Sequence, residues 1–128
     1  MRYLSLYRPA DVKQAESGTP PTPEEMARMG EFMGEFIKTG KLLAAEGCLP
    51  TSAGMKVRQA GGKVTVTDGP FTEAKEVIAG LAVLAADSRE EAIEQARLFL
   101  AVAGDGECEI RLLHEQPACC PADGACGP

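Results

Sequence analysis

Acidic side chains gather in the segment TDGPFTEAKE, residues 67–76, which joins two stretches that have the character of strands. Asp68 begins the segment, and Glu73 and Glu76 follow it three residues apart. In a short helical turn those two glutamates would share one face. Together with Asp68 and Glu46 they could form an acidic site, where crowded carboxylates raise one another's pKa and divide the roles of acid and base. Such oxygens also suit a hard cation, but an exposed acidic loop is the interpretation that we favour.

The sequence Asp-Gly-Pro-Phe, residues 68–71, has the composition of a tight turn and is called the DGPF corner below. Asp accepts hydrogen bonds from nearby backbone N–H groups, Gly permits unusual dihedral angles, and Pro fixes φ. We therefore expect Asp68 to accept such bonds and to remain ionised, with its pKa lowered by them. We expect Phe71 to pack over the edge of the sheet. The functional alternative places Asp68 in a cleft as a base or a ligand anchor.

Histidine and arginine supply the other candidates for chemistry. His114 is the only histidine, and the alternation of residues 107–115 places it on the apolar side of a strand. We interpret it as a hydrogen-bonded residue at the edge of the core, with proton transfer beside a carboxylate as the alternative. Arg58 and Arg111 could each anchor an anion, but they are more simply surface charges. The candidate catalytic residues are therefore Asp68, Glu46, Glu76 and His114.

The five cysteines do not form a recognisable disulfide or metal pattern. An odd number in a chain without secretory features argues against a disulfide framework. Cys48 and Cys108 are most simply small buried hydrophobic residues. The other three have the spacing Cys-Cys-x5-Cys, without the CxxC pair of a zinc site, so we predict no metal and no cofactor. A thiol or metal sensor in the tail is the alternative, and its residues are Cys119, Cys120 and Cys126.

Composition and charge limit the class of protein. The chain has 128 residues, which suits one domain, and a net charge of −6 with a pI of about 4.8. An acidic surface argues against nucleic acid and against anionic membranes as partners, because both are bound through Lys and Arg. No apolar run approaches the roughly 18 residues that span a bilayer, and the N-terminus does not resemble a signal peptide. We therefore expect a cytoplasmic protein.

Periodicity and turn residues predict a β-α-β unit, a hairpin and a second β-α-β unit. Thr22, Pro23 and Glu25 are typical of a capping box at the start of a helix, and Ser88 with Glu91 repeats this pattern. The apolar face of the first helix contains Met26, Met29, Met33, Phe36 and Ile37. The predicted elements are a strand at 2–7, a loop or flap at 9–23, a helix from Thr22 to Gly40, a strand at 41–50, a hairpin at 55–69 that turns at Gly61 and Gly62, a strand at 77–86, a helix from Ser88 to residue 104 and a strand at 107–115.

This order predicts an α+β fold, a ferredoxin-like βαβ-hairpin-βαβ sandwich. Residues 1–115 would form a single domain, and residues 116–128 a flexible tail rich in Cys, Pro and Gly. Both helices then cover one face of the sheet. The segment 77–86 is apolar on both sides, so the second face also needs a cover. A second copy of the chain would supply that cover, which predicts a homodimer.

The segments AAEGCLP, DGPFTEAKE and VIAGLAVLAADSREEAIEQA give the chain a resemblance to the DGPF-domain branch of the YCII-related family, from Met1 to about Glu115. The resemblance implies a ferredoxin-like fold and a dimeric α/β barrel-like assembly whose sheets pack face to face. Some members of the broader family look like small-molecule lyases or hydrolases with a His–Asp pair, and Glu25 stands where their histidine is expected. Genes of the DGPF branch are also associated with extracytoplasmic-function sigma factors.

We therefore expect the protein to bind a small polar metabolite in a cleft near the DGPF corner. Whether it also performs lyase- or hydrolase-type turnover is open at this point. One alternative is a non-enzymatic accessory protein in transcription linked to such a sigma factor, and another is the thiol or metal sensor of the tail. A cleft with converging polar groups would favour the first function. An exposed apolar patch on a closed core would favour an accessory protein.

Overall fold

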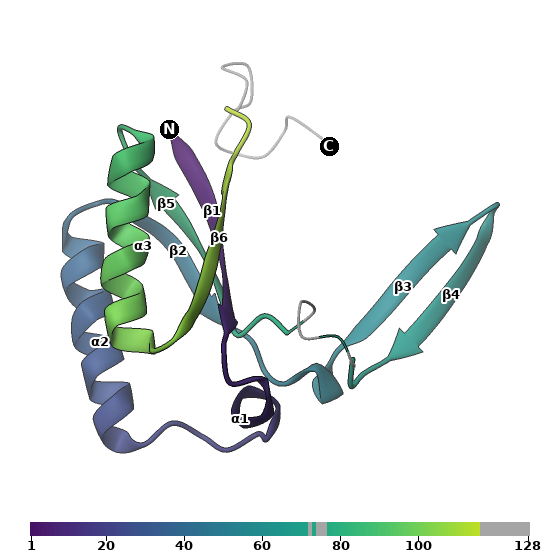
Figure 1. The fold of residues 1–128 in the computed structure, drawn as a ribbon. Helices are drawn as coiled ribbons and strands as arrows, with labels where there is room; N and C mark the ends of the chain where they lie inside the picture. Colours follow the sequence, from purple (N-terminus) through teal and green to yellow (C-terminus); the bar gives the residue numbers. More distant parts are fainter. Residues whose placement is uncertain (72, 74–76, 116–128) are drawn as a thin grey trace.

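The computed structural model describes residues 1–71, 73 and 77–115. Its centre is a four-stranded antiparallel sheet in which the strand order is β2-β5-β1-β6. Helices α2 and α3 cover one face of this sheet, and a separate hairpin, β3-β4, stands away on the other side (Figure 1). The elements are β1 (Arg2–Pro9), α1 (Val12–Glu16), α2 (Pro23–Lys38), β2 (Leu42–Gly47), the 3-10 turn η1 (Thr51–Ala53), β3 (Met55–Ala60), β4 (Lys63–Asp68), β5 (Gly80–Ala85), α3 (Arg89–Ala103) and β6 (Gly106–Leu112).

The order of the elements matches the predicted α+β arrangement. Strands β1 and β2 with helix α2 form one β-α-β unit, β5 and β6 with α3 form the other, and the hairpin is inserted between them. Strand β5 lies between β2 and β1, so it is the central strand that its two apolar sides predicted. It begins at Gly80, three residues later than predicted, although Ala79 already donates its N–H to the Tyr7 carbonyl at 2.9 Å.

Both long helices begin at the predicted residues. Thr22 Oγ1 accepts the N–H of Glu25 at 3.1 Å, and the Glu25 carboxylate accepts the N–H of Thr22 at 2.9 Å, so the capping box of α2 is confirmed. In α3, Ser88 likewise accepts the N–H of Glu91 at 3.1 Å. The second predicted box is only half formed, because the Glu91 carboxylate accepts the N–H of Asp87 at 3.1 Å instead of that of Ser88.

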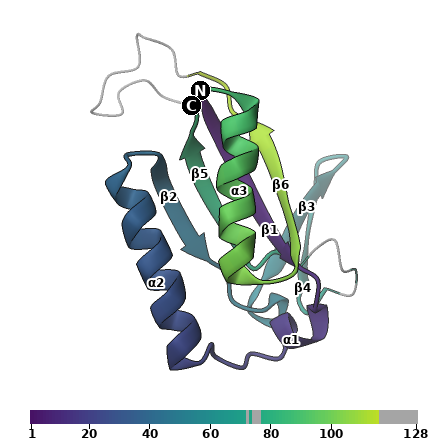
Figure 2. The same ribbon diagram turned by 60° about the vertical axis from the view of Figure 1, so that its left-hand side comes forward.

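The segment 9–23 was predicted to be a loop, but part of it is the five-residue helix α1. Asp11 caps this helix, since its carboxylate accepts the N–H of Gln14 at 3.0 Å. A helix of this length is too short to show a periodic apolar face, which explains why the sequence pattern did not indicate it. Figure 2 shows α1 at the lower end of the molecule, close to the base of the hairpin.

The core beneath the helices is small. The buried cluster is Tyr3, Leu84, Ala86 and Ala92, with Phe36, Leu42, Ala82 and Ile110 packed against it. From α2, Phe36 joins this cluster, whereas Met26 and Ile37 on the same predicted apolar face are each 60% exposed. Part of the apolar face of α2 therefore borders open space instead of core.

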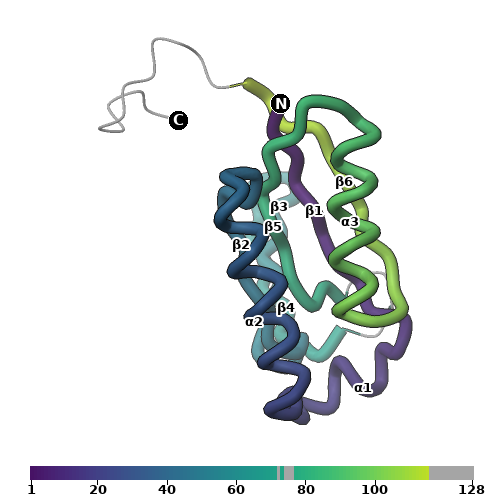
Figure 3. The backbone as a smooth tube through the Cα atoms, turned by 90° about the vertical axis from the view of Figure 1, so that its left-hand side faces the viewer, coloured from purple at the N-terminus to yellow at the C-terminus, as the bar shows by residue number. Residues whose placement is uncertain are grey.

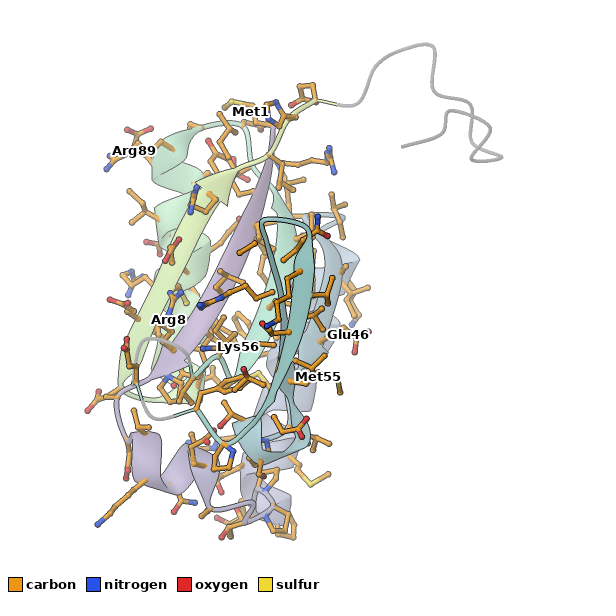
Figure 4. All side chains as sticks on the ribbon, turned by 90° about the vertical axis from the view of Figure 1, so that its right-hand side faces the viewer. Met1, Arg8, Glu46, Met55, Lys56 and Arg89 are labelled. Carbon is orange, nitrogen blue, oxygen red and sulfur yellow. The ribbon has the colours of Figure 1, made fainter. Side chains whose placement is uncertain are left out.

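The face of the sheet opposite the helices is not covered by any element in the described part of the chain (Figure 1). Successive residues of a strand point to opposite faces, and Tyr3 and Leu84 point towards the helices. The open face therefore carries Leu4 and Leu6 on β1 opposite Val83 and Leu81 on β5. Figure 4 looks onto this side, where the hairpin lies in front of the sheet.

The hairpin has the predicted register and turn. Val57 lies opposite Val66, and Gly61 and Gly62 at the tip have φ angles of 57° and 81°. Two successive residues with positive φ are typical of the tight turn that joins two-residue hairpins. The apolar side chains on one face of the hairpin are between 56% and 66% exposed, and they are Met55, Val57, Val64 and Val66.

Candidate functional site

A cavity of about 620 Å³ lies between α2, α3 and the face of the sheet that these helices cover. Figure 3 shows the two helices standing apart over the sheet. The volume falls within the range of small-molecule sites, roughly 300–1,000 Å³. Residues from both helices and the sheet line the cavity, and they include Met26, Met29, Met33, Tyr7, Gln95 and Phe99.

Small residues opposite α2 explain the space. The methionines of α2 face positions on β2, β5 and α3 whose side chains are too short to fill the volume, namely Ala45, Gly47, Gly80, Ala82 and Ala96. At Gly80 the neighbouring strand requires this small size, since a Cβ atom there would lie 3.2 Å from the Glu46 carbonyl oxygen. The cavity is therefore a consequence of the Ala- and Gly-rich composition of β2 and β5.

The charge at the cavity is acidic. Glu25 and Glu46 are among its lining residues, but Glu46 pairs with Leu81 and its side chain points to the opposite face of the sheet. In the described part of the chain no Lys, Arg or His lines the cavity. The hydrogen bond from the backbone N–H of Thr22 lowers the pKa of the Glu25 carboxyl, and the side chain of Thr22 adds to this effect. Glu25 is therefore ionised at neutral pH. Electrostatics at the cavity disfavours ligands that carry a negative charge.

Gln95 lines the cavity and carries a buried acceptor without a hydrogen-bond partner. Its side chain is 9% exposed, and its Nε2 donates to the Ala85 carbonyl at 3.2 Å and to the Glu91 carboxylate at 3.4 Å. Because both neighbours are acceptors, the amide must direct its NH₂ group towards them. Its Oε1 is buried and has no hydrogen-bond partner. Buried polar atoms without a partner are rare in folded proteins, but this oxygen has less than 1 Å² of accessible surface, so a ligand in the cavity does not reach it in this structure.

Tyr7 and Phe99 form an aromatic wall of the cavity. Their rings meet edge-on, with centroids 5.3 Å apart. The Tyr7 hydroxyl donates to the carbonyls of Gly104 and Asp105 at 3.4 and 3.3 Å. Burial raises the pKa of the Tyr7 phenol, and the neighbouring Cys108 and Asp105 raise it further. The phenol is therefore uncharged at neutral pH, and its polar end is directed to the backbone after α3.

The structure does not bring the predicted catalytic residues together. Glu46 lies on the edge strand β2 and borders the cavity, but it pairs with Leu81, so its side chain points to the open face of the sheet. His114 lies at the opposite edge of the sheet, because it follows β6, which ends at Leu112. The predicted position of His114 on the apolar side of a strand is wrong, since the residue is exposed beyond the end of β6. Its backbone carbonyl accepts a hydrogen bond from the Arg2 guanidinium at 2.8 Å.

The other predicted residues are not at the cavity either. Asp68 is the last residue of β4, is exposed and does not line the cavity. Cys48, which we expected to be buried, is exposed just beyond the end of the edge strand β2. Within residues 1–71, 73 and 77–115 there is no group of three or more His, Cys, Asp or Glu that could hold a metal ion. Outside the described residues lie Glu76, Cys119, Cys120 and Cys126.

The DGPF corner is held by Thr51 and not by Asp68. The Gly69 N–H donates to the Gly54 carbonyl at 2.9 Å, and the peptide bond between Gly69 and Pro70 is cis. Next along the chain, the Phe71 N–H donates to Thr51 Oγ1 at 3.0 Å. The backbone hydrogen bonds that we expected at the Asp68 carboxylate are not formed within the described residues.

Thr51 connects this corner to α1. The residue is 9% exposed, its N–H donates to the Glu16 carboxylate at 3.0 Å, and its hydroxyl donates to the same carboxylate. Phe71 lies at the base of the hairpin and not over the sheet edge, with the Lys56 ammonium 4.5 Å from its ring centroid. The DGPF corner is therefore part of a polar and aromatic anchor for the hairpin, separate from the cavity.

Sequence reasoning missed Gln95 and Tyr7, which contribute a polar and an aromatic residue to the lining of the cavity. Gln95 lies on the same side of α3 as Ala92, Ala96 and Phe99, at the three- and four-residue spacing of a helix face. A glutamine within an apolar helix face is the signal that could have indicated a buried polar contact. Tyr7 gave no comparable signal, because aromatic residues are common in strands.

The sheet order, the position of both helices on one face and the cavity beneath them define an α+β protein of the ferredoxin type with a ligand-sized space. The model of the YCII-related domain matches residues 1–113, and the chain belongs to the YCII-related family. This confirms the resemblance at the level of the family, while membership of the DGPF-domain branch stays a prediction. No described helix is both long and apolar enough to cross a membrane.

Two known proteins are similar to parts or most of this chain. An uncharacterized protein of Rhizobium meliloti (strain 1021) is 35% identical over 80 residues, a match that covers 62% of this chain and 64% of the relative's length. The solved structure of 5-chloro-2-hydroxyhydroquinone dehydrochlorinase from Burkholderia phenoliruptrix AC1100, in complex with 2,5-dihydroxybenzoquinone, superposes with a TM-score of 0.50 and 12% identity. That similarity covers 91% of this chain and 96% of the other, and it supports the fold.

Proposed function

We propose that this protein binds a small molecule with an apolar body in the cavity between α2, α3 and the sheet. The observation that carries the proposal is the 620 Å³ space lined by the methionines of α2. Methionine side chains adapt to the shape of a bound group and make favourable contacts with aromatic rings. The sequence pointed to a polar metabolite near the DGPF corner, but the apolar lining supports a different ligand in a different place.

A lyase-type reaction in this cavity is consistent with the fold, because the dehydrochlorinase of similar fold carries out an elimination, as its name states. Of the residues predicted to be catalytic, Glu46 borders the cavity, but its side chain points to the open face of the sheet, because it pairs with Leu81. Glu25 also lines the cavity, but its carboxylate is engaged by the Thr22 N–H. We therefore propose binding without assigning the role of proton acceptor to either glutamate.

The binding proposal is tested with ¹³C-methyl NMR of the methionines and 2-naphthol as the probe. Met26, Met29 and Met33 line the cavity, whereas Met55 lies on the hairpin and serves as an internal control. The cavity signals should shift on titration and the Met55 signal should not. Shifts of equal size at Met55 would indicate nonspecific binding and contradict the proposal.

Neighbouring alanines on β2 provide matched variants for the same titration. Ala45 lines the cavity, while Ala44 does not line it and lies opposite Val83 of β5, on the open face. Ala45→Phe should fill the space and abolish the shifts, and Ala44→Phe should retain them. If Ala45→Phe folds and still gives the wild-type shifts, the probe does not occupy this cavity.

We propose further that the chain forms a homodimer through the open face of the sheet. The face has an apolar centre formed by Leu4, Leu6, Leu81 and Val83. Exposed apolar surface that is continuous across two strands is typical of an interface. The hairpin stands on the same side with a second exposed apolar face (Figure 4), so a second copy could cover both, in the face-to-face assembly that the family resemblance implies.

The accessory role, the sensor in the tail and the cytoplasmic location are still predictions from the sequence. The accessory role in transcription rests on the family resemblance alone. The tail, on which the thiol or metal sensor depends, lies outside the described residues. The cytoplasmic location likewise stays a prediction from composition.

A further inference from the structure

Gly30 lies in the interior of α2, which runs from Pro23 to Lys38. Glycine is the least favourable residue after proline in a helix interior, because it loses more backbone freedom on folding than any other residue. Crowding by a neighbouring element would explain a glycine there. A Cβ atom built on Gly30, however, would meet no atom from another part of the described chain within 4 Å. Packing within the chain therefore does not account for this glycine.

Gly30 borders the cavity. Met26 and Met33 line the cavity with it, and they are its neighbours on the helix surface, since they stand four residues before it and three residues after it. Phe32 lies about 200° away around the helix, and its ring is 6.3 Å from that of Phe99 on α3. Gly30 is therefore on the side of α2 turned away from α3, towards the edge strand β2, over which α2 lies in Figure 3.

The backbone of α2 at Gly30, with Met26 and Met33 on either side, is called the bare patch below. Close approach of the backbone to a ligand is one of the reasons for which proteins use glycine. The space that one missing side chain leaves is shallow, so a flat group fits it better than a thick one. The thioethers beside the patch suit such a group when it is aromatic, because sulfur often contacts the edge of an aromatic ring.

We infer that Gly30 is a specificity-determining residue, and that a planar aromatic ring of the ligand lies on the bare patch, where a side chain at residue 30 would stand. The inference rests on the proposed function, since it specifies the ligand class of the same cavity. It also explains why α2 contains a glycine that neither its own stability nor its packing requires.

Two probes with the same bicyclic skeleton and one hydroxyl group test the inference: 2-naphthol, which is flat, and trans-2-decalol, which is not. Dissociation constants are measured from the methyl shifts of Met26, Met29 and Met33. We expect wild-type protein to bind 2-naphthol about 3–10-fold more tightly, as for the contacts of one ring with sulfur and aromatic neighbours. Nuclear Overhauser effects should connect the naphthol ring protons to the Hα atoms of Gly30 and not to those of Gly34, which does not line the cavity.

Gly30→Leu and Gly34→Leu are the matched variants, because an added Cβ meets open space at both positions and only Gly30 lines the cavity. Leucine favours the helix more than glycine does, so the melting temperature should be unchanged or higher in both. Gly30→Leu should weaken the binding of 2-naphthol by at least about 10-fold, as expected when a filled site is overpacked, and Gly34→Leu should retain it. If Gly30→Leu does not fold, Gly30→Ala and Gly34→Ala give the same comparison in the same direction.

The outcomes separate the two proposals. Equal affinity for the two probes, wild-type affinity for 2-naphthol in folded Gly30→Leu, or the absence of contacts at the Gly30 Hα atoms would each overturn the inference. Shifts at the cavity methionines would still support the binding site in those cases. Absence of shifts at these methionines with both probes would refute the proposed function itself.

Discussion

Gly69 lies directly against the backbone of Thr51, so closely that a Cβ atom on residue 69 would overlap the Thr51 carbonyl oxygen. The same threonine accepts the Phe71 N–H through its hydroxyl and donates its own hydrogen bonds to the Glu16 carboxylate. The glycine of the DGPF corner is therefore required by a close backbone approach. The acid that precedes it has no comparable contact among the described residues.

Replacing Gly69 by alanine should destabilise the protein, because the added methyl group forces Gly69 and Thr51 apart. We expect a loss of about 1–3 kcal/mol in the free energy of unfolding, the usual cost of overpacking. Urea titration followed by circular dichroism measures it. Gly34→Ala in α2 is the control: no atom lies within 4 Å of its added Cβ, so it should be neutral or stabilising by up to about 1 kcal/mol. Equal stability of the two variants would show that the corner adapts without cost.

Thr51→Val should also destabilise the fold, since it leaves the Phe71 N–H without its acceptor and removes the hydroxyl from Glu16. A buried group that loses its partner costs about 1–3 kcal/mol. Thr51→Ser retains the hydroxyl and should lose much less, and Ser52→Ala, at the exposed neighbouring position, should have little effect. Thermal unfolding of the three variants checks this order. If Thr51→Ser were less stable than Thr51→Val, the effect would be assigned to lost methyl packing, because valine retains the methyl group and serine does not.

Asp68→Asn and Asp68→Ala should each change the free energy of unfolding by less than about 0.5 kcal/mol, as is usual for exposed positions without partners. The reason is that no group among the described residues donates to the Asp68 carboxylate. Asp11→Ala serves as the positive control, because Asp11 caps α1 through the Gln14 N–H and should cost about 1 kcal/mol. If the melting temperature of Asp68→Ala is well below that of Asp68→Asn, Asp68 has the turn-capping role that the sequence suggested.

Light scattering should give twice the chain mass of 13.5 kDa at micromolar concentration. Leu6→Glu places a charge in the apolar centre of the open face and should give the monomer mass. Ile93→Glu is the matched control, since Ile93 is 47% exposed on α3 and lies outside the proposed interface. A wild-type monomer, or a dimer that both variants retain, would contradict the proposed interface.

Stability should decrease in acid because of Glu109. Its pKa is lowered by the hydrogen bond from Arg111 and then by that from Arg8, so the folded state binds fewer protons than the unfolded chain. The stabilisation is present above the ordinary value of 4.5 and is lost as the pH falls through the lower folded pKa. Urea midpoints measured from pH 6 to pH 3 should fall less steeply in Glu109→Gln than in wild type. Identical slopes would mean that Glu109 does not contribute.

Local signals predicted most of the fold because the elements depend on short-range chemistry. The capping box of Thr22 and Glu25, the two glycines of the hairpin tip and the apolar central strand each appear in the structure as expected. The exception among the elements is α1, whose five residues are too few for a periodic pattern. The end of β6 was also missed, because alternation continues in the sequence beyond Leu112, where the hydrogen-bonded strand ends.

The site was less predictable, because it depends on which side chains meet across layers. Acidic residues drew attention to Asp68, yet the cavity lies elsewhere and is formed by small residues of β2 and β5 facing the methionines of α2. No local pattern states that Ala45 and Met29 lie on opposite sides of one space. Glu46 was predicted and borders the cavity, but its side chain points to the other face of the sheet. Gln95 required knowledge that the Ala85 carbonyl and the Glu91 carboxylate use up its amide donors.

The attachment of the hairpin also has a mechanical consequence. Each of its strands has six residues, so the arm is about 20 Å long. It leaves the body of the protein at Gly54 and Gly69, which are joined by one backbone hydrogen bond of 2.9 Å. Over that length, a tilt of about 10° at the base moves the tip by about 3.5 Å. Thr51 and Glu16 lie at the base of the hairpin. A small change in the backbone there would therefore produce a larger displacement of the valines near the tip.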